Sequence, residues 1–138
     1  MKAILLLALL AVPVVAASAE KAPVLGAGYR AMAVPVEAKR LRWIEPGDRV
    51  DVLATFEAKL GAKGDDGKQT VTATILQNVI VLSVDHKEGL VELQVNPNES
   101  QYVAVFHGMD KGLWLIKRAA GDLEMHPMEM ATASKLFR

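Results

Sequence analysis

Alternation of apolar and polar residues is the most regular feature of this chain, and it predicts a series of short β-strands. Successive side chains of a strand point to opposite faces, so a half-buried strand is apolar at every second position. This pattern occurs at 29–36, 50–56, 70–76, 90–95 and 113–118. The run 79–82 is apolar on both faces, which indicates a central strand covered on each side. We therefore expect about six short strands in a compact, mainly β domain.

The strand at 50–56 follows a turn formed by Pro46, Gly47 and Asp48. Proline presets φ for the first corner of a turn, and glycine can adopt the positive φ that the second corner needs. The carboxylate of Asp48 can accept a backbone hydrogen bond and fix the exit of the turn. We predict structural roles for these three residues, as a tight turn that begins a half-buried strand.

One helix is predicted immediately after the strand at 90–95. Asn96 can cap it, Pro97 suits its first position, and Glu99 lies three residues after the cap, as in a capping box. With helical spacing, four apolar residues then share one face. They are Tyr102, Val103, Phe106 and Met109.

Pro35 and the segment after it define a candidate contact surface. Proline cannot donate to a ladder of strand hydrogen bonds, so the strand at 29–36 is expected at a sheet edge or with a bulge. The segment 37–43 is strongly basic. Such a run is either a solvated loop or a binding patch. The candidate partner contacts are the three cations of this segment and one of the preceding strand. They are Lys39, Arg40, Arg42 and Arg30.

The N-terminus has the pattern of an export signal. Lys2 precedes the uncharged apolar run 3–15, and a small-x-small motif follows. An uncleaved membrane anchor is the alternative, but the apolar run is shorter than the roughly 20 residues that a spanning helix needs. We therefore expect cleavage and a periplasmic protein. The residues of the cleavage site are Ala17, Ala19 and Glu20.

Charge and cysteine content exclude several classes of protein. The chain has 16 basic and 16 acidic residues, and removal of Lys2 with the leader leaves 15 against 16. A nearly neutral chain lacks the excess of positive charge that attracts nucleic acids or anionic membranes. The absence of cysteine excludes disulfide bonds and lipoprotein acylation, so the fold depends on packing alone.

Five segments, in order along the chain, resemble the C-terminal domain of CpaB/RcpC-type Flp (tight adherence) pilus assembly proteins. They are 28–36, 46–53, 74–82, 91–97 and 112–118. The chain is thus divided into a leader at 1–19, a linker at 20–27, an RcpC-like domain at 28–118 and a tail at 119–138. The polar segment 61–68 is assigned to a hairpin loop within the domain.

The resemblance implies a non-enzymatic periplasmic component of a Flp pilus or of a related secretin-dependent secretion apparatus. It further implies an outer-membrane secretin or another pilus component as partner, and a fold in the neighbourhood of SAF and β-clip domains. Typical relatives are longer, with a membrane anchor and a SAF-type domain upstream. Here only a short segment separates the leader from Gly28, so we expect neither feature.

Two alternatives come from other parts of the chain. Thioethers with a histidine suit Cu(I) or Ag(I), and the tail carries such a cluster in Met125, His126, Met128 and Met130. The other interpretation of these methionines is a tail that packs on the domain. The second alternative is a glycan- or peptidoglycan-binding module that stacks sugars on Tyr29, Trp43 and Trp114, although only 5% of the residues are aromatic.

No catalytic constellation is recognisable, and no cofactor is expected. The histidines at 86, 107 and 126 lack the spacing of a zinc site. Asp48 and Asp51 are the nearest approach to an acid–base pair. In a strand that leaves a turn, we expect them to cap the turn and to face solvent or Arg49, and we predict that the protein is not an enzyme.

Overall fold

The computed structural model describes residues 22–59, 67–107 and 112–136 of the chain. Five longer strands, one α-helix, a two-residue strand and two short 3-10 helices form the described part. In chain order they are β1 (Arg30–Pro35), η1 (Ala38–Leu41), β2 (Arg49–Lys59), β3 (Lys68–Asp85), β4 (Leu90–Val95), α1 (Pro97–His107), β5 (Leu113–Lys117), β6 (Ala131–Thr132) and η2 (Ala133–Lys135). The predicted leader and cleavage site lie outside the described residues.

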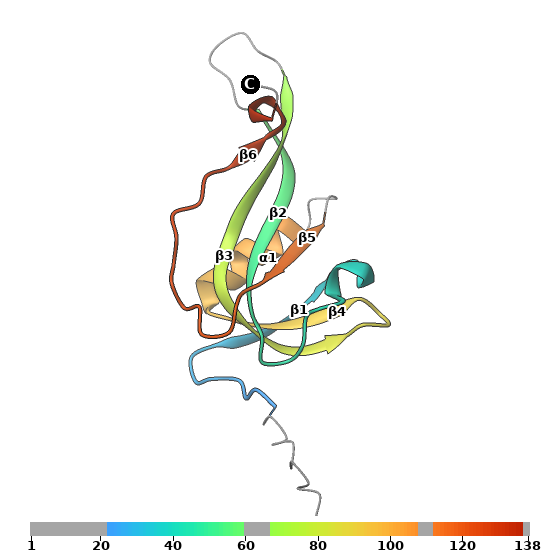
Figure 1. Cartoon of the computed structure of the whole chain (residues 1–138), viewed down its shortest axis with the longest axis vertical. Coiled ribbons are helices and arrows are strands. Elements are labelled where there is room, and N and C mark those ends of the chain that lie inside the picture. The colour runs from blue at the N-terminus through green and yellow to red at the C-terminus, as the bar shows by residue number, and fades with distance from the viewer. Residues whose placement is uncertain (1–21, 60–66, 108–111, 137–138) are drawn as a thin grey trace, which may run out of the picture.

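All six strands belong to one antiparallel sheet, which confirms the predicted mainly β fold (Figure 1). Their order is β1-β4-β3-β2-β5, and β6 pairs with β3 outside this path. Four observed strands, β1, β2, β4 and β5, lie where the sequence predicted strands, at 29–36, 50–56, 90–95 and 113–118. Among the described residues, no helix is long and apolar enough to cross a membrane.

β3 is the central strand, and it joins two segments that were predicted as separate strands. It runs for 18 residues and passes through Asn78, whose φ is 60°. Asparagine tolerates this left-handed conformation better than most residues. The Asp51 carboxylate accepts a hydrogen bond from the Asn78 N–H at 2.9 Å, and Arg49 Nη1 donates to the Asn78 side chain at 3.0 Å. The strand therefore bends at this residue instead of ending there.

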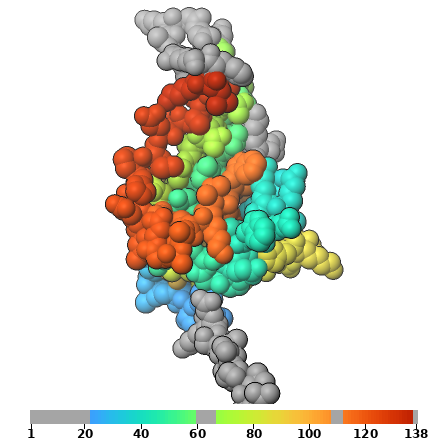
Figure 2. Space-filling model, viewed as in Figure 1, coloured from blue at the N-terminus to red at the C-terminus, as the bar shows by residue number. Residues whose placement is uncertain are grey.

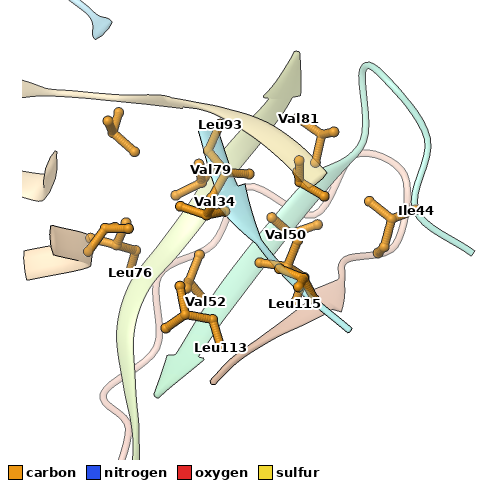
Figure 3. Close-up of a cluster of buried hydrophobic side chains, with 14 of the residues drawn as sticks. Val34, Ile44, Val50, Val52, Leu76, Val79, Val81, Leu93, Leu113 and Leu115 are labelled. Carbon is orange, nitrogen blue, oxygen red and sulfur yellow. The ribbon is translucent and has the colours of Figure 1, made fainter. Parts of the chain in front are cut away.

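The two halves of β3 have different partners, and the apolar core lies where they meet. Residues 68–80 pair with β2, whereas residues 80–85 pair with β4. Figure 3 shows core side chains from both groups of strands, such as Leu93 and Val50, gathered in one cluster. The buried members are Val34, Val36, Leu41, Ile44, Val50, Val52, Ala54, Leu76, Val79, Val81, Val91, Leu93, Val95, Val103, Leu113 and Leu115.

The predicted helix forms, and its capping box is present. Asn96 Oδ1 accepts from the backbone N–H of Glu99 at 2.9 Å, and Glu99 Oε2 accepts from the Asn96 N–H at 2.7 Å. Val103 is fully buried, and the Phe106 ring lies 5.1 Å from that of Phe56. Tyr102 was predicted on the same apolar face as Val103 and Phe106, but only a narrow stripe of the helix meets the sheet and Tyr102 remains 59% exposed. Met109 lies outside the described residues.

Two further elements differ from the sequence prediction. The basic segment 37–43 contains a turn of 3-10 helix, since Leu41 enters the core and fixes the backbone around it. The strand at 113–118 was expected to be the last one. However, β6 follows it and pairs with Val71 and Thr72 of β3. A strand of two residues is too short to show any alternation in the sequence.

Candidate functional site

The turn before β2 is built from backbone hydrogen bonds to two parts of the chain. Gly47 adopts a φ of 92°, in the positive range expected at the second corner. The Asp48 N–H donates to Glu45 O at 3.1 Å, and Asp48 Oδ2 accepts from the Glu45 N–H at 2.7 Å. Val81 of β3 accepts from Gly47 N–H at 2.8 Å and donates to Asp48 O at 2.9 Å. The turn is therefore joined directly to the central strand.

A buried arginine, which the sequence analysis did not single out, clamps the tail to the sheet. Arg118 follows β5 and is only 8% exposed. Its Nη1 donates to Asp51 Oδ1 at 2.9 Å, and its Nη2 donates to Asp122 Oδ1 at 2.9 Å. The same guanidinium also donates to the backbone oxygens of Asp122 and Glu124. We call these residues, Arg118, Asp51 and Asp122, the Arg118 clamp.

Hydrogen bonding within the Arg118 clamp shifts two pKa values in the directions expected of an ion pair. Two hydrogen bonds raise the pKa of Arg118 above its usual value. The bond to Asp122 has the larger effect and the bond to Asp51 the smaller. The bond from Arg118 is the main cause that lowers the pKa of the Asp122 carboxyl. Both groups therefore remain charged at neutral pH, and the clamp is closed there.

The two carboxylates considered as an acid–base pair are both bound to cations. Asp48 Oδ2 lies 2.8 Å from Lys117 Nζ, and Asp51 is held by Arg118. Arg49, which was expected to face them, instead donates to Asn78. Because these cations neutralise both carboxylates, the arrangement stabilises the start of β2 and offers no free base.

Aromatic and cationic side chains gather where η1 lies beside β5. The Arg40 guanidinium lies 3.5 Å from the centroid of the Trp114 ring, and Arg40 Nη1 donates to Leu113 O at 3.3 Å. Arg40 Nε is 3.1 Å from Glu37 Oε2, as an ion pair without the alignment of a hydrogen bond. Lys39 Nζ lies 2.6 Å from the other Glu37 oxygen, and this bond is the main cause that lowers the pKa of Glu37.

The structure divides the predicted partner contacts between the two ends of the sheet. Lys39, Arg40 and Arg42 lie on or next to η1, which contacts β5. Arg30 is exposed in β1, at the other end of the strand order, and its guanidinium donates to Tyr29 O at 3.0 Å. The aromatic residues considered for sugar stacking are divided in the same way, with Tyr29 before β1 and Trp114 in β5. They form no single platform.

The tail runs along an edge of β3 and is held there by a side-chain amide. Gln77 Nε2 donates to His126 O at 2.7 Å, and Gln77 Oε1 accepts from the His126 N–H at 3.0 Å. The Gln77 side chain thus binds both backbone groups of His126, as the backbone of a neighbouring strand would do. Met125, Met128 and Met130 are exposed. Within the described ranges no three His, Cys, Asp or Glu residues group as metal ligands, and thioether binding of copper stays a prediction.

A shallow groove of about 410 Å³ lies between β3, the start of α1 and the tail. Its charged lining residue, Glu99, already serves the helix cap through its bond to Asn96. The remaining lining is neutral, which gives the groove no acid–base or anion-binding chemistry. It is formed by Thr74, Ile75, Leu76, Gln77, Asn96, Asn98, Tyr102 and Met125.

These features define a small antiparallel β domain in which Asp48, Asp51 and Arg118 are held in ion pairs, whereas Trp43 and Trp114 are exposed. The family model described as Flp pilus assembly protein RcpC/CpaB matches residues 20–107, which is more than half of the chain. The chain belongs to this family, and the predicted resemblance is confirmed. Membership implies a role in Flp pilus assembly. The match ends before β5, although the resemblance noted in the sequence extends to Arg118. No curated protein and no solved structure gave a match.

Proposed function

We propose that this protein acts in Flp pilus assembly by binding other envelope proteins, and that its partner is the periplasmic region of an outer-membrane secretin. The observation that carries the proposal is the family match over residues 20–107. The engagement of Asp48 and Asp51 with cations supports a binding role over a catalytic one.

The outer edge of β1 supports binding by strand addition. Within the described ranges β1 pairs only with β4. The Val36 N–H donates to Gly89 O at 2.8 Å, so alternate residues before Val36 also face β4. The backbone groups of Ala31 and Ala33 then point away from the sheet. An open edge of this kind can accept an extended segment of a partner.

A deletion strain tests the role in assembly. Loss of the gene should abolish or reduce Flp pili. Wild-type protein should restore them, and so should a variant with Met125, Met128 and Met130 changed to leucine, because leucine keeps the apolar character but cannot bind copper. Normal pili together with reduced copper tolerance, restored by the wild type but not by the leucine variant, would replace the assembly role with metal binding.

A proline substitution tests the β1 edge. Ala33→Pro removes an N–H that points away from β4, and proline is tolerated at such a position of an edge strand. The variant should keep its melting temperature and lose binding to the purified periplasmic region of the secretin. Met32→Pro is the matched control, because its N–H faces β4 and the substitution should destabilise the fold itself.

We also propose export to the periplasm, on the basis of the leader at 1–19. N-terminal sequencing of the protein released by osmotic shock should begin at Glu20. Recovery of the protein in the membrane pellet with Met1 intact would show that the leader is retained.

A further inference from the structure

One exposed surface of the molecule is aromatic and apolar where β5 faces away from the core. Leu113 and Leu115 are buried, so the alternate residues Trp114 and Ile116 point outward, and both are exposed. Trp43 is 72% exposed, and its backbone oxygen accepts from Lys117 Nζ at 3.2 Å, which places it beside the end of β5. Arg40, three residues before Trp43, lies 3.5 Å from the Trp114 ring centroid and connects the two tryptophans. We call Trp43, Trp114 and Ile116 the Trp43–Trp114 surface.

The charges around the Trp43–Trp114 surface are mainly positive. Four cations surround it, and two carboxylates, Glu37 and Asp48, neutralise them in part. Arg42 makes no ion pair with any residue in the described part of the chain, and its guanidinium lies 5.2 Å from the Trp43 ring centroid. Arginine and tryptophan are both enriched at the centres of protein interfaces. The cations are Lys39, Arg40, Arg42 and Lys117.

The tail segment 123–130 has the complementary chemistry. It contains neither helix nor strand, and its three methionines are exposed together with Leu123. The side chains of Glu124 and Glu129 are 82% and 92% exposed, although Glu124 lies 4.0 Å from His126 Nε2 and Glu129 lies 3.4 Å from Lys135 Nζ. The segment is therefore an irregular, acidic stretch of chain with exposed apolar side chains, of which Met125 also lines the groove beside β3.

The two surfaces lie on different sides of one molecule. In Figure 1 the tail runs along β3 on the left, whereas η1 lies to the right beyond β5, and Figure 2 shows the same separation. The tail is also fixed to its own β3 by Gln77 and by β6. Segment 123–130 of a chain therefore does not reach the Trp43–Trp114 surface of the same chain while these contacts hold.

We propose that segment 123–130 of one copy binds the Trp43–Trp114 surface of a second copy. Glu124 or Glu129 pairs with Arg42, and methionine sulfurs contact the tryptophan rings, an interaction that is favourable in proteins. The contact joins two different surfaces, so one copy of the pair retains a free Trp43–Trp114 surface and the other retains a free tail segment. Such head-to-tail contacts build a ring or a filament. This inference concerns self-assembly and does not depend on the proposed secretin partner.

The oligomeric state of the full-length protein gives the first test. Light scattering after size-exclusion chromatography should show growth of the assembly with concentration, and Arg42→Glu should weaken self-association roughly tenfold. Trp43→Ala should act in the same direction. Arg30→Glu and Tyr102→Ala are matched controls for charge and for aromatic area at exposed sites elsewhere, and they should have no effect. A monomer at every concentration, or equal effects of Arg42→Glu and Arg30→Glu, would overturn the proposal.

The tryptophans report the position of the contact. The chain has 2 tryptophans, and both belong to the Trp43–Trp114 surface. A synthetic peptide of residues 122–131 should shift both indole N–H resonances in an NMR titration. The same peptide with lysine at positions 124 and 129 should not. Unshifted indole resonances, or equal shifts with the two peptides, would contradict the proposed contact.

A charge exchange completes the test, because it distinguishes loss of the contact from damage to the fold. Arg42→Glu and the double variant Glu124→Lys, Glu129→Lys should each self-associate weakly. Mixed together they should associate again, since the reversed surface of one then meets the reversed tail of the other. Failure of the mixture, with both variants melting like wild type, would contradict the pairing of these charges. Binding of the secretin region by Arg42→Glu would meanwhile leave the proposed function intact.

Discussion

The body of the domain and the arm that extends from it are stabilised in different ways. The arm is the outer part of the β2–β3 hairpin, residues 55–59 and 67–73, which projects beyond β1, β4 and β5 in Figure 1 and pairs with β6 along one edge. The body contains the whole apolar cluster, in which residues such as Val50 and Leu93 are completely buried. In the described part of the arm, Val71 is the buried apolar residue, and it lies outside that cluster.

Polar contacts and the returning tail take the place of a core in the arm. The hydroxyls of Thr55 and Thr72 lie 3.0 Å apart across the two strands. Beyond them, β6 pairs with Val71 and covers one edge of β3, and Ser134 donates to the Gln69 side chain at 3.1 Å. A single hydrogen bond adds little net stability, so the arm depends on its continuity with the body and on the tail. The comparison predicts large mutational effects in the body and small ones in the arm.

The largest effect should follow truncation in the middle of the body. Leu93→Ala leaves a cavity among side chains from several strands and should lower the free energy of unfolding by about 2–5 kcal/mol. Urea denaturation followed by tryptophan fluorescence measures the change. A loss below about 1 kcal/mol would mean that the core relaxes around the cavity, and the contrast with the arm would disappear.

A smaller loss of unfolding free energy should follow a change in the turn that precedes β2. Gly47→Val places a β-branched residue at a φ of 92°, at a cost of about 1–2 kcal/mol. No atom lies within 4 Å of the added Cβ, so the cost is one of backbone conformation alone. Gly47→Asn is the control, because asparagine tolerates positive φ better and should lose less. Equal melting temperatures for wild type and Gly47→Val would show that the turn relaxes freely.

In the arm, a substitution of similar size should cost less. Thr72→Val removes the hydroxyl bond to Thr55 and keeps a β-branched side chain that suits a strand, so the net change should stay below about 1 kcal/mol. The same denaturation experiment measures it. A cost as large as that of Leu93→Ala would mean that the arm and the body share one cooperative network of contacts.

The same comparison explains which parts of the structure could be predicted from the sequence. Strands such as β4 bury one face in the body, so burial imposes the alternation that sequence analysis detects. The capping box at Asn96 is local and was equally recognisable. Gln77 and Asn78 were missed because their partners are distant in sequence, as with the Gln77 amide and the backbone of His126. Asp122 is only four residues from Arg118, but the Asp51 partner that ties Arg118 to β2 is distant. A polar residue that interrupts an apolar strand pattern, as Asn78 does, is the signal that could have indicated the bend.

The smallest effect concerns the Arg118 clamp, and it should be present at neutral pH and disappear in acid. Arg118 lowers the pKa of Asp122, so the unfolded chain takes up a proton on this carboxyl at a higher pH than the folded protein does. The stability that the clamp contributes is therefore complete above the unfolded value, near pH 4, and is lost as the pH falls through the lower folded pKa.

Asp122→Asn isolates this contribution, because asparagine keeps the size of the side chain but cannot titrate. Wild type should melt higher than the variant at pH 7, and the difference should shrink below about pH 4. Hydrogen exchange should show that the tail after Asp122 opens more often in the variant, while the amides of β4 stay as protected as in wild type. The body would then keep its stability when the clamp is lost. Equal loss of protection in β4 and in the tail would instead show that the tail unfolds only with the whole domain.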